Sequence, residues 1–371
     1  MKIAIDLTAL ADNFSGIERM ALSVTEELLQ LDVKNQYQLF FKEKIHEKFQ
    51  KFIEEDRIEI VVLPRKNKLW FSQVTLRNAL QRSDADIFVF LAFPAPFFLH
   101  GKKIVNTIHD VGYWDCPETM PTKMVLYFRL MAWRAGKASW KIITISEFSK
   151  RRIQQHLKNS ADKIKVIYLG VSPGMYETQD GDWEQIRAKY HLPEHYIMCL
   201  STLEPRKNMA LLAKAYMEIP AEKLRGCDLV LAGRRGWKMD EFLNELSEEE
   251  RKRICITGYV DDANLPALYR HAEVFVFPSI YEGFGIPPLE AMAAGCPVIC
   301  SDIDAHREIL GEMAVYFRSN DKEDLQRTLI GCMNGDIPVP SSDSLIQYSR
   351  KYSYQKAAKE LQEILKENKG E

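Results

Sequence analysis

The sequence predicts an α/β protein of two domains, each built on a parallel β-sheet. Its 371 residues exceed the usual size of one domain, and two domains are the natural expectation. Short apolar runs alternate with amphipathic helical patterns along nearly the whole chain. This alternation is typical of βαβ units, whose strands are covered on both faces and therefore read as continuous apolar runs.

The predicted elements follow one another in regular order. Strands of the first half are expected at Lys2–Leu7, Tyr37–Phe41, Ile58–Leu63, Ile87–Leu91, Lys103–Ile108, Lys141–Ile145 and Lys165–Tyr168. Helices between them are expected at Ile17–Leu31, Phe71–Arg82, Pro121–Ala138 and Glu147–Leu157. Ser146 precedes the last of these helices and suits its N-cap, since a serine oxygen there accepts a main-chain N–H.

The second half repeats the pattern. Its strands are expected at Tyr196–Leu200, Asp228–Ala232, Ile254–Thr257, Val274–Phe277, Pro297–Cys300 and Ala314–Phe317. Its helices include Met209–Ile219, Asn264–His271 and Pro288–Ala294, and one long amphipathic helix from about Ser344 to Lys366.

A polar connecting stretch from Gly170 to about His195 separates the halves. We therefore expect an N-terminal domain at 1–170, a C-terminal domain at 171–345 and a C-terminal helix at 346–371. Residues 1–170 carry 26 Lys and Arg against 19 Asp and Glu, whereas residues 171–371 carry 24 against 33. A basic N-terminal half suits an anionic surface or acceptor, but charge also varies between domains without functional meaning.

Composition narrows the cellular setting. The seven cysteines contain no C-x-x-C pair, and Cys199, Cys227, Cys255 and Cys300 lie in short apolar runs, which indicates buried free thiols in a reducing compartment. The N-terminal residues form a strand pattern without the apolar stretch of a signal peptide. We expect a cytoplasmic protein with no nucleic-acid partner.

The most informative segment follows the strand at Val274–Phe277. It reads Ser279-Ile-Tyr-Glu-Gly-Phe-Gly-Ile-Pro-Pro-Leu-Glu290, a glycine-rich turn that leads into a helix. Main-chain N–H groups and the helix dipole make such a helix start an anion site, and Gly283 and Gly285 allow close approach of a ligand. Glu282 in the turn can accept hydroxyl hydrogen bonds, and Glu290 on the helix suits a ribose diol.

A second segment, Leu203-Glu-Pro-Arg-Lys-Asn208, also follows a strand and precedes a helix. Two adjacent cations, Arg206 and Lys207, oppose the dipole of a helix start, which makes sense where a diphosphate binds. On its own, an exposed basic turn explains the segment equally well.

These two motifs resemble glycosyltransferase family 4, a family of retaining enzymes with the GT-B fold. The E-x7-E motif of the family matches Glu282 to Glu290, and the E-P-R-K-N form matches residues 204–208. The resemblance implies two Rossmann-like domains that face each other across a cleft, with a C-terminal helix that crosses back to the first domain. Ser201-Thr202 departs from the Gly-Arg of many members, so one phosphate-binding arginine is missing and Arg206 is expected to take its role.

The resemblance also assigns roles to single residues. It implies that Glu290 binds the donor ribose, and that Glu282 holds hydroxyls of the donor sugar near the reacting carbon. The backbone of Gly283, Phe284, Gly285 and Ile286 would meet the sugar and the diphosphate. Further donor contacts are expected from Gly16 in the N-terminal half and from Gly233 and Tyr259 in the C-terminal half.

His109-Asp110 ends a strand of the N-terminal half and is followed by Pro117, as in the family. The resemblance places His109 beside the donor sugar and the acceptor. An Asx-type turn explains the same pair without any catalytic role. Ser15 lies beside Gly16 in the expected N-terminal glycine loop, and Glu308 matches another acidic position of the family's motif region. Both are equally well explained as helix-start residues.

Residues 120–141 form a basic amphipathic segment. Lys123, Arg134, Lys137 and Lys141 fall near one helical stripe, and large apolar side chains such as Trp133 fill other faces. The pattern suits peripheral contact with a membrane or a lipid-linked acceptor. A core helix with a solvated basic face is the alternative.

The expected function is retaining transfer of a hexosyl unit, mannose favoured, from a nucleotide-diphosphate sugar to a glycan or lipid-linked saccharide acceptor in bacterial polysaccharide synthesis. Catalytic roles fall to His109, Glu282, Arg206 and Lys207. GDP-mannose is the favoured donor, with UDP- and dTDP-sugars as alternatives, and neither a cofactor nor a metal is expected. A nucleotide-sugar epimerase, a phosphorylase and an inactive nucleotide-sugar-binding module remain open alternatives.

Overall fold

The chain folds into two compact units. The computed structural model describes residues 1–11, 16–64, 67, 70–158, 163–177, 182–202, 204–233, 247–248 and 252–367. Unit 1 comprises Met1–Asp115, Pro121–Gly170 and Tyr352–Glu371, and unit 2 comprises Cys116–Met120 and Val171–Lys351. The segment 346–371 is therefore divided, with its first six residues in unit 2 and the remainder in unit 1.

Unit 1 is built on a parallel sheet. Its strands are β1 (Lys2–Asp6), β2 (Gln36–Lys42), β3 (Ile58–Leu63), β4 (Ile87–Phe90), β5 (Lys103–Thr107), β6 (Lys141–Thr144) and β7 (Ile164–Val166). They are ordered β3-β2-β1-β4-β5-β6-β7, and all neighbours pair in parallel. The buried strands β4 and β1 sit at the centre, which explains their unbroken apolar character.

The helices of unit 1 are α1 (Gly16–Leu31), α3 (Arg77–Arg82), α4 (Gly112–Asp115), α5 (Thr122–Ala138), α6 (Glu147–His156) and α16 (Tyr354–Lys366). A π-helical stretch at Phe71–Leu76 leads into α3. Ser146 caps α6 as predicted, because its Oγ accepts the main-chain N–H of Ser149 at 3.0 Å.

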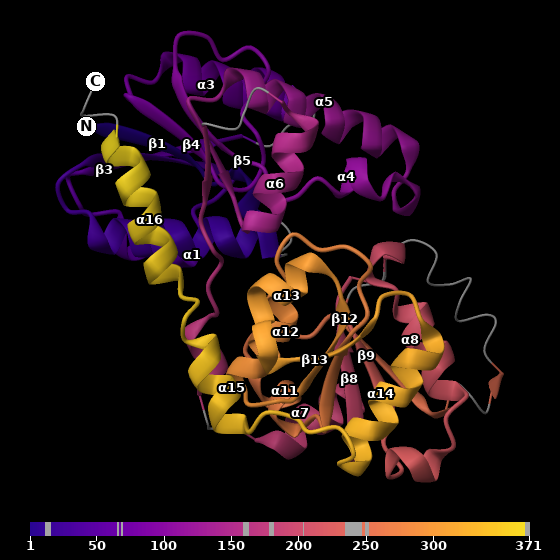
Figure 1. The fold of residues 1–371 in the computed structure, drawn as a ribbon. Helices are drawn as coiled ribbons and strands as arrows, with labels where there is room; N and C mark the ends of the chain where they lie inside the picture. The colour runs from indigo at the N-terminus through magenta and orange to yellow at the C-terminus, as the bar shows by residue number, and fades with distance from the viewer. Residues whose placement is uncertain are drawn as a thin grey trace. The chain divides into compact units, whose positions relative to one another are not determined.

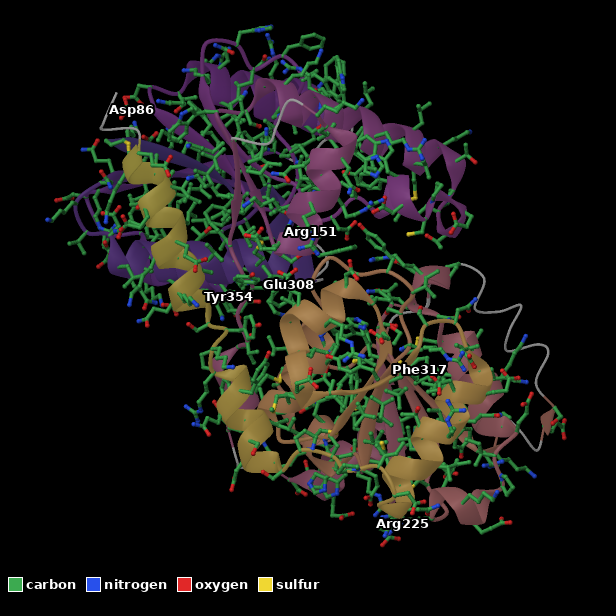
Figure 2. All side chains as sticks on the ribbon, in the orientation of Figure 1. Asp86, Arg151, Arg225, Glu308, Phe317 and Tyr354 are labelled. Atoms are coloured by element: carbon green, nitrogen blue, oxygen red, sulfur yellow. The ribbon has the colours of Figure 1, made fainter. Side chains whose placement is uncertain are left out.

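The C-terminal helix is not the single long helix that the sequence pattern predicts. The chain forms α15 (Ser342–Ser349) in unit 2, leaves helical structure near Arg350, and starts α16 after Ser353, whose side chain caps it. Tyr354, labelled in Figure 2, is its first residue. The apolar face of α16 packs along α1 within unit 1 (Figure 1).

Unit 2 repeats the architecture with six parallel strands. They are β8 (Tyr196–Leu200), β9 (Asp228–Ala232), β10 (Ile254–Gly258), β11 (Val274–Phe277), β12 (Val298–Asp302) and β13 (Val315–Arg318). Their order, β10-β9-β8-β11-β12-β13, is that of a Rossmann-like sheet. All predicted strands of both units are confirmed to within two residues.

The helices of unit 2 are α7 (Trp183–Tyr190), α8 (Met209–Met217), α11 (Leu265–His271), α12 (Ile286–Ala293), α13 (Asp304–Leu310), α14 (Lys322–Asn334) and α15. The helices expected from the sequence do not include α7 or α14, and the helix start considered at Glu308 falls inside α13, which begins at Asp304. Asp182 and Asp321 cap α7 and α14 through their carboxylates. Apolar side chains from strands and helices, among them Phe317 (labelled in Figure 2), form the core of the unit.

Helix α5 exposes apolar side chains. Its buried face is made of small and medium residues, whereas Met124, Leu126, Tyr127, Leu130 and Trp133 are exposed at helical spacing. The prediction that the large apolar residues lie away from the basic stripe is therefore wrong for Trp133, whose ring lies 4.4 Å from Lys137 Nζ. The exposed face of α5 is both apolar and cationic.

Two further findings concern the chain as a whole. None of the helices among the described residues combines the length and apolar composition needed to cross a bilayer. All seven cysteines are free, and Cys199, Cys227 and Cys300 are buried as predicted, while Cys255 is partly exposed.

The segment before α16 lies against Gly170, and this contact generates a testable prediction. A Cβ at Gly170 would stand 2.1 Å from the main-chain nitrogen of Tyr354, within the same unit. We expect Gly170→Ala to destabilise the protein by about 2 kcal/mol, since overpacking forces backbone apart. Gly174→Ala is the matched control, because its Cβ would come no closer than 3.9 Å to another atom. Equal thermal midpoints for the two variants would contradict the prediction.

Candidate functional site

Three loops meet at the carboxyl edge of the sheet in unit 2. They follow β8, β11 and β12, and β11 lies between the other two strands. The first two loops are joined by their backbones, because the N–H of Ile280 donates to the carbonyl of Arg206 at 3.0 Å. Ligands of open parallel sheets bind at this edge.

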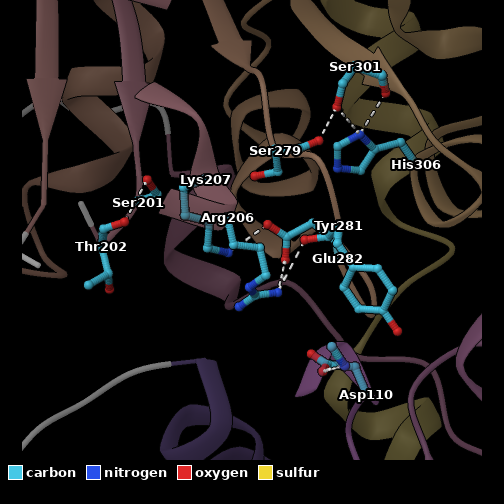
Figure 3. A network of polar contacts seen from close by, with 11 residues as sticks. Asp110, Ser201, Thr202, Arg206, Lys207, Ser279, Tyr281, Glu282, Ser301 and His306 are labelled. Carbon is cyan, nitrogen blue, oxygen red and sulfur yellow. Dashed lines mark hydrogen bonds and ion pairs between the residues drawn. The ribbon is translucent and has the colours of Figure 1, made fainter. Parts of the chain in front are cut away.

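A buried ion pair joins the two sequence motifs. Lys207 Nζ lies 2.6 Å from Glu282 Oε1, and Arg206 donates to Glu282 Oε2 at 3.4 Å and to the Tyr281 carbonyl at 3.2 Å (Figure 3). The Glu282 residue is only 7% exposed. Lys207 also lies 5.5 Å from the ring of Phe277. The sequence assigns these cations to a diphosphate and does not show that they hold Glu282.

The pair keeps Glu282 ionised. Burial by itself would raise the pKa of this carboxyl, but the charges of Lys207 and Arg206 and the hydrogen bond from Lys207 outweigh it. The result is a pKa lowered from 4.5 to about 2. Glu282 is therefore a permanent anion that can accept hydrogen bonds and cannot donate a proton near neutral pH.

The sequence suggests that the two cations occupy a helix start, and the structure places them just before one. Arg206 and Lys207 lie in a short 3₁₀ turn at Pro205–Lys207, and α8 begins only at Met209. Asn208, between this turn and α8, has a positive φ of 54°, which redirects the chain into the helix. The turn directs both side chains toward the loop after β11 instead of along the axis of α8.

Helix α12 carries Glu290, and its start is the helix start that the sequence predicts as an anion site. Glu290 is 2% exposed and accepts the Tyr269 hydroxyl at 3.3 Å. Gly285 precedes the helix with a φ of 101°, a conformation that favours glycine. Pro287 and Pro288 have no N–H, so the first turn offers an anion fewer donors than an ordinary helix start. The positive charge that balances an anion at this edge of the sheet would therefore come mainly from Arg206 and Lys207.

Gly233 and Tyr259 lie at the ends of neighbouring strands. The N–H of Gly233 donates to the Gly258 carbonyl at 2.8 Å, and a Cβ at Gly233 would stand 1.9 Å from the carbonyl oxygen of Ser201. Only glycine allows this close approach of the loops after β8 and β9. The Tyr259 ring is half exposed beside them. Residues 234–236, which follow Gly233 in the chain, lie outside the described residues.

His306 is a residue of this region that the sequence motifs do not identify. It lies on α13, fully buried, with Nδ1 2.9 Å from the Ser301 carbonyl and its ring 5.5 Å from that of Phe277. Burial lowers the pKa of His306, so the ring is neutral near pH 7. Tyr269, the partner of Glu290, likewise carries no recognisable motif. Glu308 lies on the same helix as His306.

His109 and Gly16 belong to unit 1 and are described within it. His109 follows β5, with Nε2 3.2 Å from the Ala92 carbonyl, and burial lowers its pKa. Asp110 forms the Asx-type bond that the alternative interpretation expects, accepting the N–H of Gly112 at 2.9 Å. Gly16 is the exposed first residue of α1, and Ser15 lies outside the described residues.

The D-x-D pattern at Asp302–Asp304 serves the fold. Asp302 binds Arg307 at 2.7 and 2.8 Å, and Asp304 is the first residue of α13. Within the described ranges, no three His, Cys, Asp or Glu residues gather in a way that could hold a metal ion.

The buried ion pair predicts the effect of removing Lys207. Lys207→Met leaves Glu282 buried with one weaker partner, and we expect a loss of about 3 kcal/mol at pH 7. The difference from wild type should shrink as pH falls from 4.5 toward 2, because the lowered pKa of Glu282 stabilises only the ionised state. Lys322→Met removes an exposed pair with Glu218 and should cost far less, because solvent screens an exposed ion pair. Urea unfolding at several pH values measures both, and equal losses would refute the assignment.

Two protein families match the chain, one for each half. Residues 14–174 match Glycosyltransferase Family 4, and residues 182–352 match the glycosyl transferases group 1 family. A solved structure of Anabaena Alr3699/HepE in complex with UDP-glucose superposes with a TM-score of 0.74 at 18% identity, covering 99% of this chain and 100% of that one. This similarity shows the fold.

Among curated relatives, O-antigen chain mannosyltransferase B of Escherichia coli is 34% identical over 238 residues, which cover 63% of this chain and 62% of the relative. The serotype-specific mannosyltransferase WbdA of Escherichia coli is 33% identical over 194 residues, 51% of this chain and 24% of the relative. The matched regions thus span less than two thirds of these relatives. With both halves matched and the Glu282–Glu290 and Arg206-Lys207 motifs assembled at one sheet edge, the chain belongs to glycosyltransferase family 4 and has the GT-B type of fold.

Proposed function

We propose that the chain transfers a mannosyl unit from GDP-mannose to a saccharide acceptor, with retention of configuration, in the synthesis of a bacterial polysaccharide. The observation that carries the proposal is the contact of Glu282 with Arg206 and Lys207 at the edge of the sheet. Mannose is favoured because the curated relatives above are named mannosyltransferases. Both mannose and the nucleotide belong to the proposal.

The geometry suits a donor that is anionic at one end and rich in hydroxyls at the other. A diphosphate bound against Arg206 and Lys207 would compete with Glu282 for these two cations. The Glu282 carboxylate would then accept hydrogen bonds from sugar hydroxyls. In this proposal Glu290, on α12, accepts hydroxyls of the ribose. One site would then bind both ends of a nucleotide sugar.

The chemical step requires stabilisation of the leaving diphosphate. As the glycosidic bond breaks, negative charge grows on the phosphate oxygens, and preoriented cations lower the barrier. Arg206 and Lys207 supply this charge. With a pKa of about 2, Glu282 is neither a proton donor nor an effective base near neutral pH. In this proposal the acceptor proton passes to the departing phosphate on the same face of the sugar, so retention needs no pair of catalytic carboxyls.

Acceptor binding is assigned to unit 1. His109 is held at the end of β5 by the Ala92 carbonyl, and its lowered pKa leaves a neutral ring that can bond a sugar hydroxyl. The proposal needs no metal and no cofactor beyond the donor.

A donor panel tests the proposed activity. Purified protein is first incubated with GDP-, UDP- and dTDP-sugars in a thermal-shift assay, and then with the stabilising donor and short oligosaccharide acceptors. We expect transfer from GDP-mannose, and a fall in kcat of about a hundredfold or more in Glu282→Gln, which keeps the shape of the side chain and removes the charge.

The other outcomes separate the alternatives. Epimerisation of the donor without acceptor would support an epimerase, and consumption of phosphate with a glycan would support a phosphorylase. Binding of a nucleotide sugar without any reaction across the acceptor panel would support an inactive binding module. Each of these results overturns the proposed transferase.

The exposed face of α5 supports a second part of the proposal, peripheral contact with an anionic membrane that presents a lipid-linked acceptor. Leu126 is 70% exposed and Trp133 47% exposed on this face, with Lys123 and Lys137 on the same stripe. Arg134 binds the Phe97 carbonyl at 2.6 Å and so fixes the neighbouring loop, where Phe98 is also exposed. Aromatic and aliphatic groups flanked by lysines suit the lipid interface.

Vesicle co-sedimentation tests the membrane contact. The double variant Leu126→Ser, Trp133→Ser should bind vesicles of phosphatidylglycerol and phosphatidylcholine about tenfold more weakly than wild type, because two apolar anchors are lost. Val33→Ser, which replaces an equally exposed apolar residue elsewhere in unit 1, is the control. Unchanged binding by the double variant, or no binding by wild type, would contradict the proposed contact.

A further inference from the structure

A fully buried histidine lies beside the Glu282 loop and takes no part in its ion pair. His306 is fixed through Nδ1, 2.9 Å from the carbonyl oxygen of Ser301. A carbonyl oxygen can only accept, so we assign the ring proton to Nδ1, and Nε2 then presents a lone pair. The Ser301 hydroxyl donates to the Ser279 carbonyl, which ties the ends of β11 and β12 together next to the ring.

The lone pair at Nε2 is unused. In the part of the chain that the structure describes, His306 Nε2 is buried without a hydrogen-bond partner, and Ser279 Oγ nearby shares this property. A buried acceptor without a partner destabilises a fold, so its retention asks for a physical reason. If the side chain only filled space, an apolar residue such as phenylalanine or leucine would do so without leaving a buried nitrogen unpaired.

The unused edge of the ring faces the glycine-rich turn. A Cβ built on Gly285 would lie 3.3 Å from His306 Cδ2 and 3.7 Å from Nε2, so the ring edge lies against the Gly285 backbone. Gly285 is three residues after Glu282 and directly before α12. Figure 3 shows the ring between Ser301 and the Tyr281–Glu282 segment.

The loop has a reason to need an acceptor at this point. In the structure Glu282 is held by Lys207 and Arg206. Under the proposed function, the donor diphosphate takes over these cations, and Glu282 must then be held in place by its own loop. Gly285, whose backbone lies against the edge of the His306 ring, has a main-chain N–H, and among the described residues the buried Nε2 of His306 has no hydrogen-bond partner.

We propose that His306 is a positioning residue for the Glu282 loop. Its Nε2 accepts the main-chain N–H of Gly285 when the donor is bound and so holds the Glu282 carboxylate against the donor sugar. The inference rests on the proposed transferase function and adds to it a residue that acts through the loop and does not touch the substrate.

Three substitutions at one position separate the two nitrogens. In His306→Gln the amide reaches about as far as Nε2 and keeps an acceptor there. In His306→Asn the amide reaches only as far as Nδ1, so the bond to Ser301 survives and the acceptor is lost. His306→Phe keeps the ring and loses both groups. His195→Asn, at an exposed histidine that pairs with Glu273, is the matched control.

The measurements are kcat and KM with GDP-mannose, the Kd for GDP, and the thermal midpoint. We expect kcat to fall about tenfold or more in His306→Asn and His306→Phe, because a misplaced catalytic group is costly. His306→Gln should stay within about threefold of wild type, and GDP affinity should be unchanged throughout, since GDP lacks the sugar.

Two results would overturn the inference. Wild-type kcat in His306→Asn would show that Nε2 does nothing. Parallel loss of kcat, GDP affinity and thermal midpoint in all three variants would show a purely structural role.

A wild-type protein that binds a nucleotide sugar but transfers nothing defeats the proposed function separately. His306 is then judged by binding alone, from the affinity for the nucleotide sugar relative to that for its parent diphosphate. This ratio should fall in His306→Asn and persist in His306→Gln, and equal ratios refute the role.

Discussion

The buried contact of Glu282 with Lys207 and Arg206 is the constraint around which the candidate site is organised. It joins loops 75 residues apart in the chain, and the backbone bond from Ile280 to Arg206 fixes them at the same place. A carboxylate at 7% exposure would lose its charge without these cations. With them it remains ionised. Under the proposed function, an anionic ligand would take over these cations by exchanging partners with Glu282.

Much of the fold follows from the sequence because the physics is local. Strands covered on both faces must be apolar throughout, so their runs are recognisable to within two residues. The prediction of one long C-terminal helix fails because its packing is not local. An amphipathic pattern persists from 344 to 366, but the two halves of the pattern pack on different units, and Ser353 caps the second half as a separate helix. Periodicity records that a face is buried and not against what it is buried. Helices α7, α13 and α14 are short or polar, and the aspartates that cap α7 and α14 give only a weak signal.

The candidate site divides in the same way. Glu282, Glu290, Arg206 and Lys207 are recognisable because each lies in a short motif at a strand end. Their mutual contact is not, since pairing across the sheet depends on strand order. Tyr269 and His306 could not be found from any motif, because a buried tyrosine or histidine usually means ordinary core packing. The two prolines of α12 were visible in the sequence, but their consequence for the anion site needed the helix to start at Ile286 instead of Pro288.

The discontinuity of unit 1 has a consequence for how the protein is made. Residues 352–371 complete unit 1, yet they follow all of unit 2 in the chain. During synthesis the helix that covers α1 is therefore made after every residue of unit 2. The face of α1 that α16 covers stays without this helix for as long as unit 2 is being synthesised, and unit 1 cannot complete its packing before the chain has passed through the whole of the other unit.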